Sequence, residues 1–118
     1  MKKILIVEDN SDMQEIYKDL LKDSFEVIVV GTTKDAEEKL KQGRVDLMIL
    51  DIVLPGESGD AFLARVKEIP KYSGLSVIAV TVLGDLSEHL QRIHEKVICI
   101  PKPFEKEDLI KAITKMVK

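Results

Sequence analysis

The chain has 118 residues, which suits one domain with a single core, residues 1–118, and leaves no room for a second. A formal net charge of -3 and the lack of a basic run argue against nucleic-acid or membrane-surface binding by this chain. No apolar run is long enough to span a bilayer or to act as a signal peptide. The single cysteine, Cys99, excludes an internal disulfide, so we expect a cytoplasmic protein.

Five short apolar runs recur along the chain and predict five buried strands. They are rich in β-branched residues and continuous rather than alternating, which is typical of strands covered on both faces. The runs are residues 4–7, 27–30, 47–50, 77–80 and 97–100.

Between these runs the apolar spacing becomes helical. Four stripes predict helices: Met13, Ile16, Tyr17, Leu20 and Leu21; Phe62, Val66 and Ile69; Leu86, Leu90 and Ile93; and Leu109, Ile113 and Met116. A fifth helix, over residues 33–41, has a weaker pattern because only Ala36 and Leu40 face inward. Strands that alternate with helices imply right-handed crossovers and a parallel sheet. The predicted fold is therefore a three-layer αβα domain of the α/β class, with five strands and five helices.

Polar residues follow four of the five predicted strands. Glu8 and Asp9 follow the first strand, Asp51 the third, Thr81 the fourth and Lys102 the fifth. In an open doubly wound sheet, ligands bind outside the carboxyl ends of the strands, so these residues are expected to converge. Any one of them alone is best interpreted as a solvated loop residue. Their occurrence together at four strand ends predicts a site.

Three carboxylates packed together repel one another and need a compensating cation, or one of them must stay protonated. Carboxylate oxygens suit Mg²⁺, which keeps water and a phosphate oxygen among its ligands. Lys102 adds a positive charge and Thr81 a hydroxyl donor. This set suits phosphoryl transfer to a carboxylate. On position alone, a purely structural salt-bridge cluster is the alternative.

In this order and context the residues resemble the receiver domains of two-component response regulators, from Lys3 to about Val117. Each short motif is weak alone, but the set is highly specific. The resemblance rests on Glu8-Asp9, on Asp51, Pro55 and Gly59 within residues 51–59, on Thr81, and on Lys102-Pro103-Phe104.

The resemblance implies a sheet in the order 2-1-3-4-5, as in the flavodoxin-like folds. It also implies that Asp51 accepts a phosphoryl group, which Thr81 and Lys102 contact. Mg²⁺, or Mn²⁺, would be held by Glu8, Asp9, Asp51 and the backbone carbonyl of Val53. The peptide bond before Pro103 is expected to be cis.

The same resemblance implies the partners and the response. A sensor histidine kinase or a phosphotransfer protein would supply the phosphoryl group. Phosphorylation would then repack the surface formed by the fourth helix, the fifth strand and the fifth helix, which controls binding to a downstream protein that the sequence does not name. Only self-phosphorylation and autodephosphorylation are expected, without turnover of external substrates.

Several positions depart from the family pattern. Cys99 stands where a Tyr or Phe usually reports the switch, and we interpret it as a small buried core residue without a redox role. Val82 follows Thr81 where Ala or Gly is common. We hypothesise that apolar Val53 and Leu83 exclude water and lengthen the lifetime of the phosphorylated form, which the dephosphorylation rate of Leu83→Glu would test.

Two other classes of function stay open. The departures at Cys99 and Val82 would suit an interaction module that binds partners without phosphorylation. A phosphatase with an aspartyl-phosphate intermediate generally needs a second Asp two positions after the nucleophile, where Val53 stands here. The sequence does not decide whether the chain acts alone or is a piece of a longer protein.

Overall fold

A computed structural model describes residues 1–81 and 96–117. Five parallel strands form one sheet in the order β2-β1-β3-β4-β5, which confirms the fold class and the strand order. Each strand covers one of the five predicted apolar runs and exceeds it by one or two residues. The strands are β1 (Lys3–Val7), β2 (Glu26–Val30), β3 (Leu47–Asp51), β4 (Ser76–Thr81) and β5 (Val97–Pro101).

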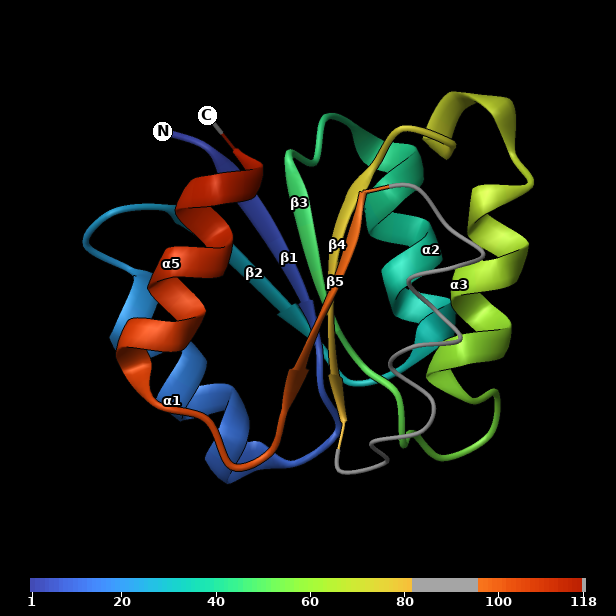
Figure 1. Cartoon of the computed structure of the whole chain (residues 1–118). Helices are drawn as coiled ribbons and strands as arrows, with labels where there is room; N and C mark the ends of the chain where they lie inside the picture. Colours follow the sequence, from blue (N-terminus) through green and yellow to red (C-terminus); the bar gives the residue numbers. More distant parts are fainter. Residues whose placement is uncertain (82–95, 118) are drawn as a thin grey trace.

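Helices cover both faces of the sheet. Figure 1 shows α1 and α5 on one face and α2 and α3 on the other. The predicted helix that carries Leu86, Leu90 and Ile93 lies outside the described residues, as do Val82 and Leu83. Within the described ranges, no helix is long and apolar enough to cross a membrane. The helices are α1 (Ser11–Leu21), α2 (Thr33–Gln42), α3 (Gly59–Lys67) and α5 (Lys106–Met116), with a short 3₁₀ helix at Pro70–Tyr72.

Short polar side chains begin the first two helices. Asn10 precedes α1 and its side chain accepts a hydrogen bond from the backbone N–H of Met13 at 2.9 Å. Thr32 precedes α2 and accepts in the same way from Asp35 at 3.1 Å. Each cap satisfies a backbone donor that the first helical turn leaves unpaired. In α2 both inward residues of the weak pattern are buried, which confirms this helix.

The sheet separates two hydrophobic clusters, because successive residues of a strand point to opposite faces. On β1, Ile4 and Ile6 belong to the cluster under α1 and α5, here called the α1–α5 cluster. Leu5 and Val7 belong to the cluster under α2 and α3, here called the α2–α3 cluster. The apolar runs of β1, β3 and β4 are buried, as predicted, whereas most of the apolar residues of β2 and half of those of β5 are only partly buried.

Among the described residues of the predicted apolar stripes, two are exposed. Ile16 on α1 is 46% exposed, and Ile69 is 38% exposed. Ile69 leaves the stripe because α3 ends at Lys67 and Pro70 opens the 3₁₀ helix, so the helical spacing stops before this residue. Ile16 keeps its place on α1 but lies at the rim of a surface groove described below.

Candidate functional site

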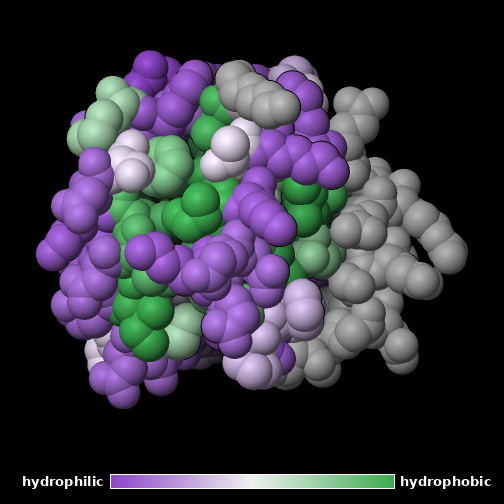
Figure 2. All heavy atoms as spheres, turned by 60° about the vertical axis from the view of Figure 1, so that its left-hand side comes forward, coloured by the Kyte–Doolittle hydropathy of each residue, from purple (hydrophilic) through white to green (hydrophobic). Residues whose placement is uncertain are grey.

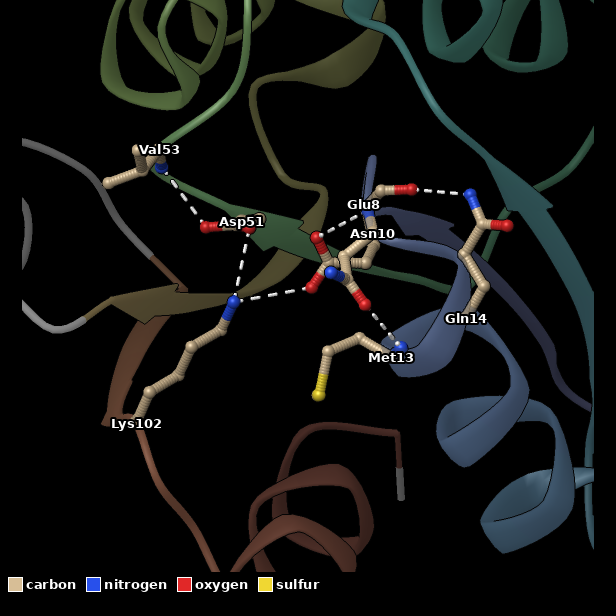
Figure 3. A network of polar contacts seen from close by, with 7 residues as sticks. All are labelled: Glu8, Asn10, Met13, Gln14, Asp51, Val53 and Lys102. Atoms are coloured by element: carbon tan, nitrogen blue, oxygen red, sulfur yellow. Dashed lines mark hydrogen bonds and ion pairs between the residues drawn. The ribbon is translucent and has the colours of Figure 1, made fainter.

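Lys102 joins two acidic residues that follow other strands. Its Nζ lies 3.1 Å from Oδ2 of Asp51 and 3.2 Å from Oε1 of Glu8, so the ammonium group sits between the two carboxylates (Figure 3). Glu8 and Lys102 are 94 positions apart in the sequence. The predicted convergence at the carboxyl edge of the sheet is therefore present for these three residues.

The alternation of side chains along the strands explains why these three groups meet. Glu8, Asp51 and Lys102 each stand two positions after a strand residue of the α1–α5 cluster, so they continue the same face of the sheet. The strand residues that precede them at this spacing are Ile6, Ile49 and Ile100. The apolar pattern of the strands thus sets the side on which the polar groups emerge.

A third carboxylate completes the acidic cluster. Glu8, Asp9 and Asp51 each offer one carboxylate oxygen, and these oxygens all lie within 4.8 Å of one another. Glu8 and Asp51 are buried, whereas Asp9 is exposed. Two buried carboxylates and one exposed carboxylate fit a hard divalent cation such as Mg²⁺, because this ion prefers oxygen ligands and keeps part of its water shell on the exposed side. The donor set therefore fits the metal that the resemblance implies.

Burial and crowding perturb the ionisation of Glu8. Burial is the largest cause, and the hydrogen bond to Asp51 and the charge of Asp51 add to it, so the pKa of Glu8 rises from 4.5 to about 7. The backbone N–H of Asn10, 3.3 Å from Oε2 of Glu8, and the charge of Lys102 oppose this rise. The cluster therefore carries more negative charge than one lysine compensates, and a cation would relieve it.

The ionisation of Lys102 responds to the same neighbours. Burial alone would lower the pKa of its ammonium group, but the hydrogen bond and charge of Asp51, together with those of Glu8, outweigh it and raise the pKa. Lys102 thus stays charged at neutral pH. A charged lysine with some exposure can reorient towards a new anion without leaving the site.

Two residues that the sequence interpretation missed hold Glu8 in place. The Nε2 atom of Gln14 donates to the backbone carbonyl of Glu8 at 2.6 Å, and the N–H of Asn10 donates to its carboxylate. An Asn directly before an apolar helical pattern signals a helix cap, so Asn10 could have been singled out. No sequence signal identifies Gln14, because its contact depends on how α1 leaves the sheet.

The segment after β3 orients Asp51. The backbone N–H of Val53 donates to Oδ1 of Asp51 at 3.0 Å, which leaves Oδ2 for Lys102. Gly59 begins α3 and packs against this segment, with its N–H donating to the carbonyl of Ile52 at 2.8 Å. A Cβ at Gly59 would lie 2.5 Å from the Cα of Ile52 and closer still to the carbonyl oxygen of Asp51. Only glycine lets the helix approach the end of β3 so closely.

Thr81 lies on β4, and Cys99 lies on the neighbouring strand β5. Thr81 is buried at the end of β4, and its carbonyl accepts a hydrogen bond from the N–H of Lys102 at 3.0 Å. The peptide bond between Lys102 and Pro103 is cis, as the resemblance implied. Cys99 was expected to be buried in the core, but it is only partly buried against the α2–α3 cluster. It belongs to β5, which pairs with β4 alone among the described strands, and that edge position leaves it partly exposed.

Comparison with known proteins agrees with this geometry. The response regulator receiver domain family matches residues 4–114, so the chain belongs to this family. The phosphate regulon transcriptional regulatory protein PhoB of Rhizobium meliloti is 30% identical over 98% of this chain and 52% of its own length. The chain spans about half or less of the length of the first curated relatives it matches.

Solved structures show the same fold. The signal receiver domain of a signal transduction histidine kinase from Syntrophus aciditrophicus has a TM-score of 0.88 and 26% identity, over 99% of this chain and 90% of that chain. The chemotaxis protein CheY4 of Vibrio cholerae has a TM-score of 0.88 and 23% identity, over 98% of both chains. Together with the family match, these likenesses define the chain as a response regulator receiver domain.

Proposed function

We propose that Asp51 accepts a phosphoryl group from a phosphohistidine of a sensor histidine kinase or a phosphotransfer protein. The observation that carries this proposal is the position of Lys102, whose ammonium group joins Asp51 to Glu8. An oxygen of Asp51 attacks phosphorus, the phosphorus–nitrogen bond of the donor breaks, and its electron pair returns to the imidazole. The product is an acyl phosphate on Asp51.

The surrounding residues divide the remaining tasks. Glu8, Asp9, Asp51 and the backbone carbonyl of Val53 would hold Mg²⁺, or Mn²⁺, which when bound neutralises charge on the phosphoryl group. Lys102 exchanges its contact with Asp51 for the incoming phosphoryl oxygens, which carry more charge. The hydroxyl of Thr81 donates to a phosphoryl oxygen.

The response would travel through β5. Lys102 and Thr81 are joined through their backbones, so a change at either residue reaches the edge of the sheet and α5. We propose that the surface of β5, α5 and the predicted preceding helix, which lies outside the described residues, changes its partner binding on phosphorylation. Cys99 in place of an aromatic residue favours a second candidate, constitutive partner binding through this surface. Partner affinity that is unchanged by phosphorylation would support that candidate.

A groove beside the site offers a contact surface for the phosphoryl donor. It has a volume of about 480 Å³ and lies between α1 and the start of α5. Figure 2 brings this side of the molecule forward, and hydrophobic residues are visible there between hydrophilic ones. Tyr17 and Phe104 stack nearby, with ring centroids 5.9 Å apart. The groove is lined by Met13, Ile16, Leu20, Lys102, Pro103, Phe104 and Lys106.

Mass spectrometry tests the acceptor directly. Wild-type protein incubated with Mg²⁺ and phosphoramidate should gain the mass of one phosphoryl group, and Asp51→Asn should not. Asp19→Asn, which changes an exposed carboxylate on α1, is the matched control and should gain the group like wild type. If wild type gains no mass with any small phosphoryl donor, the proposal fails.

Two further expectations belong to the same proposal. We place the protein in the cytoplasm, where the kinase domains that would phosphorylate it are found. We also expect no turnover of external phosphate esters, since the position two residues after Asp51 holds Val53 instead of a carboxylic acid.

A further inference from the structure

The loop between β3 and α3, residues 52–58, is fixed by backbone hydrogen bonds in its first part but not in its outer part. Its first part is fixed to the site, because the N–H of Ile52 donates to the carbonyl of Val80 at 3.2 Å and the N–H of Val53 donates to Asp51. Across the part of the chain that the structure describes, no backbone–backbone hydrogen bond reaches residues 54–57. This outer part therefore needs another anchor if the loop is to keep one shape.

Glu57 supplies that anchor through Arg65 of α3. The guanidinium group of Arg65 holds both carboxylate oxygens of Glu57, with Nε 3.1 Å from Oε2 and Nη2 2.9 Å from Oε1. Its Nη1 atom donates to Glu37 of α2. One guanidinium thus ties the loop to two helices, and such a two-pronged contact restricts orientation as well as distance.

The charges of this triad stabilise one another. Hydrogen bonds from Arg65 lower the pKa of Glu57 and of Glu37, and the two glutamates raise the pKa of Arg65 in return. All three groups are charged at neutral pH. The side chain of Glu57 is 30% exposed and that of Arg65 44% exposed, so the tie lies at the surface and its strength is limited by solvent.

We propose that Arg65 is a positioning residue for the metal site: by holding Glu57, it fixes the loop that presents the backbone carbonyl of Val53 to Mg²⁺. This inference rests on the proposed function, which makes that carbonyl a metal ligand. A loop that is already ordered binds the cation without the loss of conformational freedom that ordering would require. Exposed ion pairs change an equilibrium constant by up to about fivefold, and the two-pronged contact and second carboxylate of this triad place it in the upper part of that range, at about threefold to fivefold.

The direction in which Mg²⁺ affinity changes when Arg65 is removed distinguishes a positioning role from a purely electrostatic one. Arg65 is positive, so if it acted only through its charge, its removal would strengthen the binding of a divalent cation. If it acts by holding the loop, its removal weakens that binding. Removing the negative charge of Glu57 weakens binding in both cases, so the arginine variant is the informative one.

Isothermal titration with Mg²⁺ alone tests the proposal on the whole chain. Arg65→Met should raise the Mg²⁺ dissociation constant about threefold to fivefold. Arg65→Lys, which keeps the charge but loses the two-pronged contact, should raise it in the same direction. Adding Glu57→Gln to Arg65→Met should change it less than Glu57→Gln changes wild type, because the pair is already broken.

The matched control is Arg44→Met. Arg44 is also a surface arginine paired with a carboxylate, Asp46, but it lies just before β3, at the opposite edge of the sheet. It should leave the Mg²⁺ dissociation constant unchanged. Thermal unfolding without Mg²⁺ shows that each variant is folded. Half-maximal Mg²⁺ concentration for phosphorylation by phosphoramidate should rise in Arg65→Met, while the rate at saturating Mg²⁺ stays near that of wild type.

The outcomes distinguish this inference from the proposed function. Equal or tighter Mg²⁺ binding by Arg65→Met would overturn the positioning role while leaving the phosphoryl-acceptor site intact. Wild-type protein that neither binds Mg²⁺ nor gains a phosphoryl group would instead overturn the site itself.

Discussion

The ionisation of Glu8 should make Mg²⁺ binding at the proposed site depend on pH near neutrality. Mg²⁺ binds the charged carboxylate of Glu8, so protons compete with the metal for this group. With a pKa of about 7, Glu8 is about 90% ionised at pH 8 and about 10% ionised at pH 6. The Mg²⁺ dissociation constant should therefore rise about tenfold from pH 8 to pH 6.

Isothermal titration in two buffers of different ionisation enthalpy measures both the Mg²⁺ affinity and the number of protons that Mg²⁺ releases. Mg²⁺ should displace about one proton at pH 6 and about a tenth of a proton at pH 8. Glu8→Gln should bind Mg²⁺ more weakly at pH 8 and lose this pH dependence. A wild-type affinity that is constant between pH 6 and pH 8, without proton release, would refute the reasoning.

The same group affects stability in the absence of metal, with a definite sign. Because the pKa of Glu8 is higher in the folded protein than the ordinary 4.5, the folded state holds the proton more tightly. The contribution of Glu8 protonation to the free energy of unfolding is fully present below about pH 4.5 and is lost as the pH rises through about 7. The rise from 4.5 to about 7 corresponds to an upper bound of about 3 kcal/mol. Urea unfolding of metal-free protein against pH measures this loss, which Glu8→Gln should reduce.

Three other substitutions test separate parts of the structure. Gly59→Ala should lower the free energy of unfolding by about 3 kcal/mol, because its Cβ meets the backbone at the end of β3. In urea unfolding, Gly74→Ala, with no atom within 4 Å of the new Cβ, should stay within about 0.5 kcal/mol of wild type. Lys102→Met should bind Mg²⁺ at least about threefold more tightly in calorimetry, since the ammonium group competes for the same oxygens; weaker binding would contradict this. Ile16→Ser should slow transfer from a phosphorylated donor protein by several fold and leave phosphorylation by phosphoramidate unchanged. Ile69→Ser, which changes another exposed isoleucine that does not line the groove, should affect neither rate.

The fold was largely predictable because its signals are local. Continuous β-branched runs identified all five strands, and the residues at their carboxyl ends included Glu8, Asp51 and Lys102, which the structure brings together. Strand order came from the family resemblance, since periodicity does not specify which strands are neighbours. The helical stripe on α2 needed only Ala36 and Leu40 to be recognised correctly.

Other features depend on several elements at once and left no local signal. The spacing of Ile16 marks a helix face but does not say how far the next element covers that face. The tie between Glu57, Arg65 and Glu37 joins a loop and two helices, so it could be found only after all three had been placed. Cys99 was predicted to be a small buried core residue, but it is only partly buried, because an edge strand is covered less completely than a central one.

The strand alternation that brings Glu8, Asp51 and Lys102 to one face links chemistry to register. Deleting a single residue within β3 would keep an apolar strand there but turn Asp51 towards α2 and α3, away from the lysine. The hydrophobic residues of the sheet therefore determine the proposed phosphoryl chemistry as strictly as the charged groups do, because they set the face on which those groups emerge. An insertion should be tolerated if each polar residue stays two positions after the last core residue of its strand. An insertion that changes this spacing should abolish the cluster of Glu8, Asp51 and Lys102.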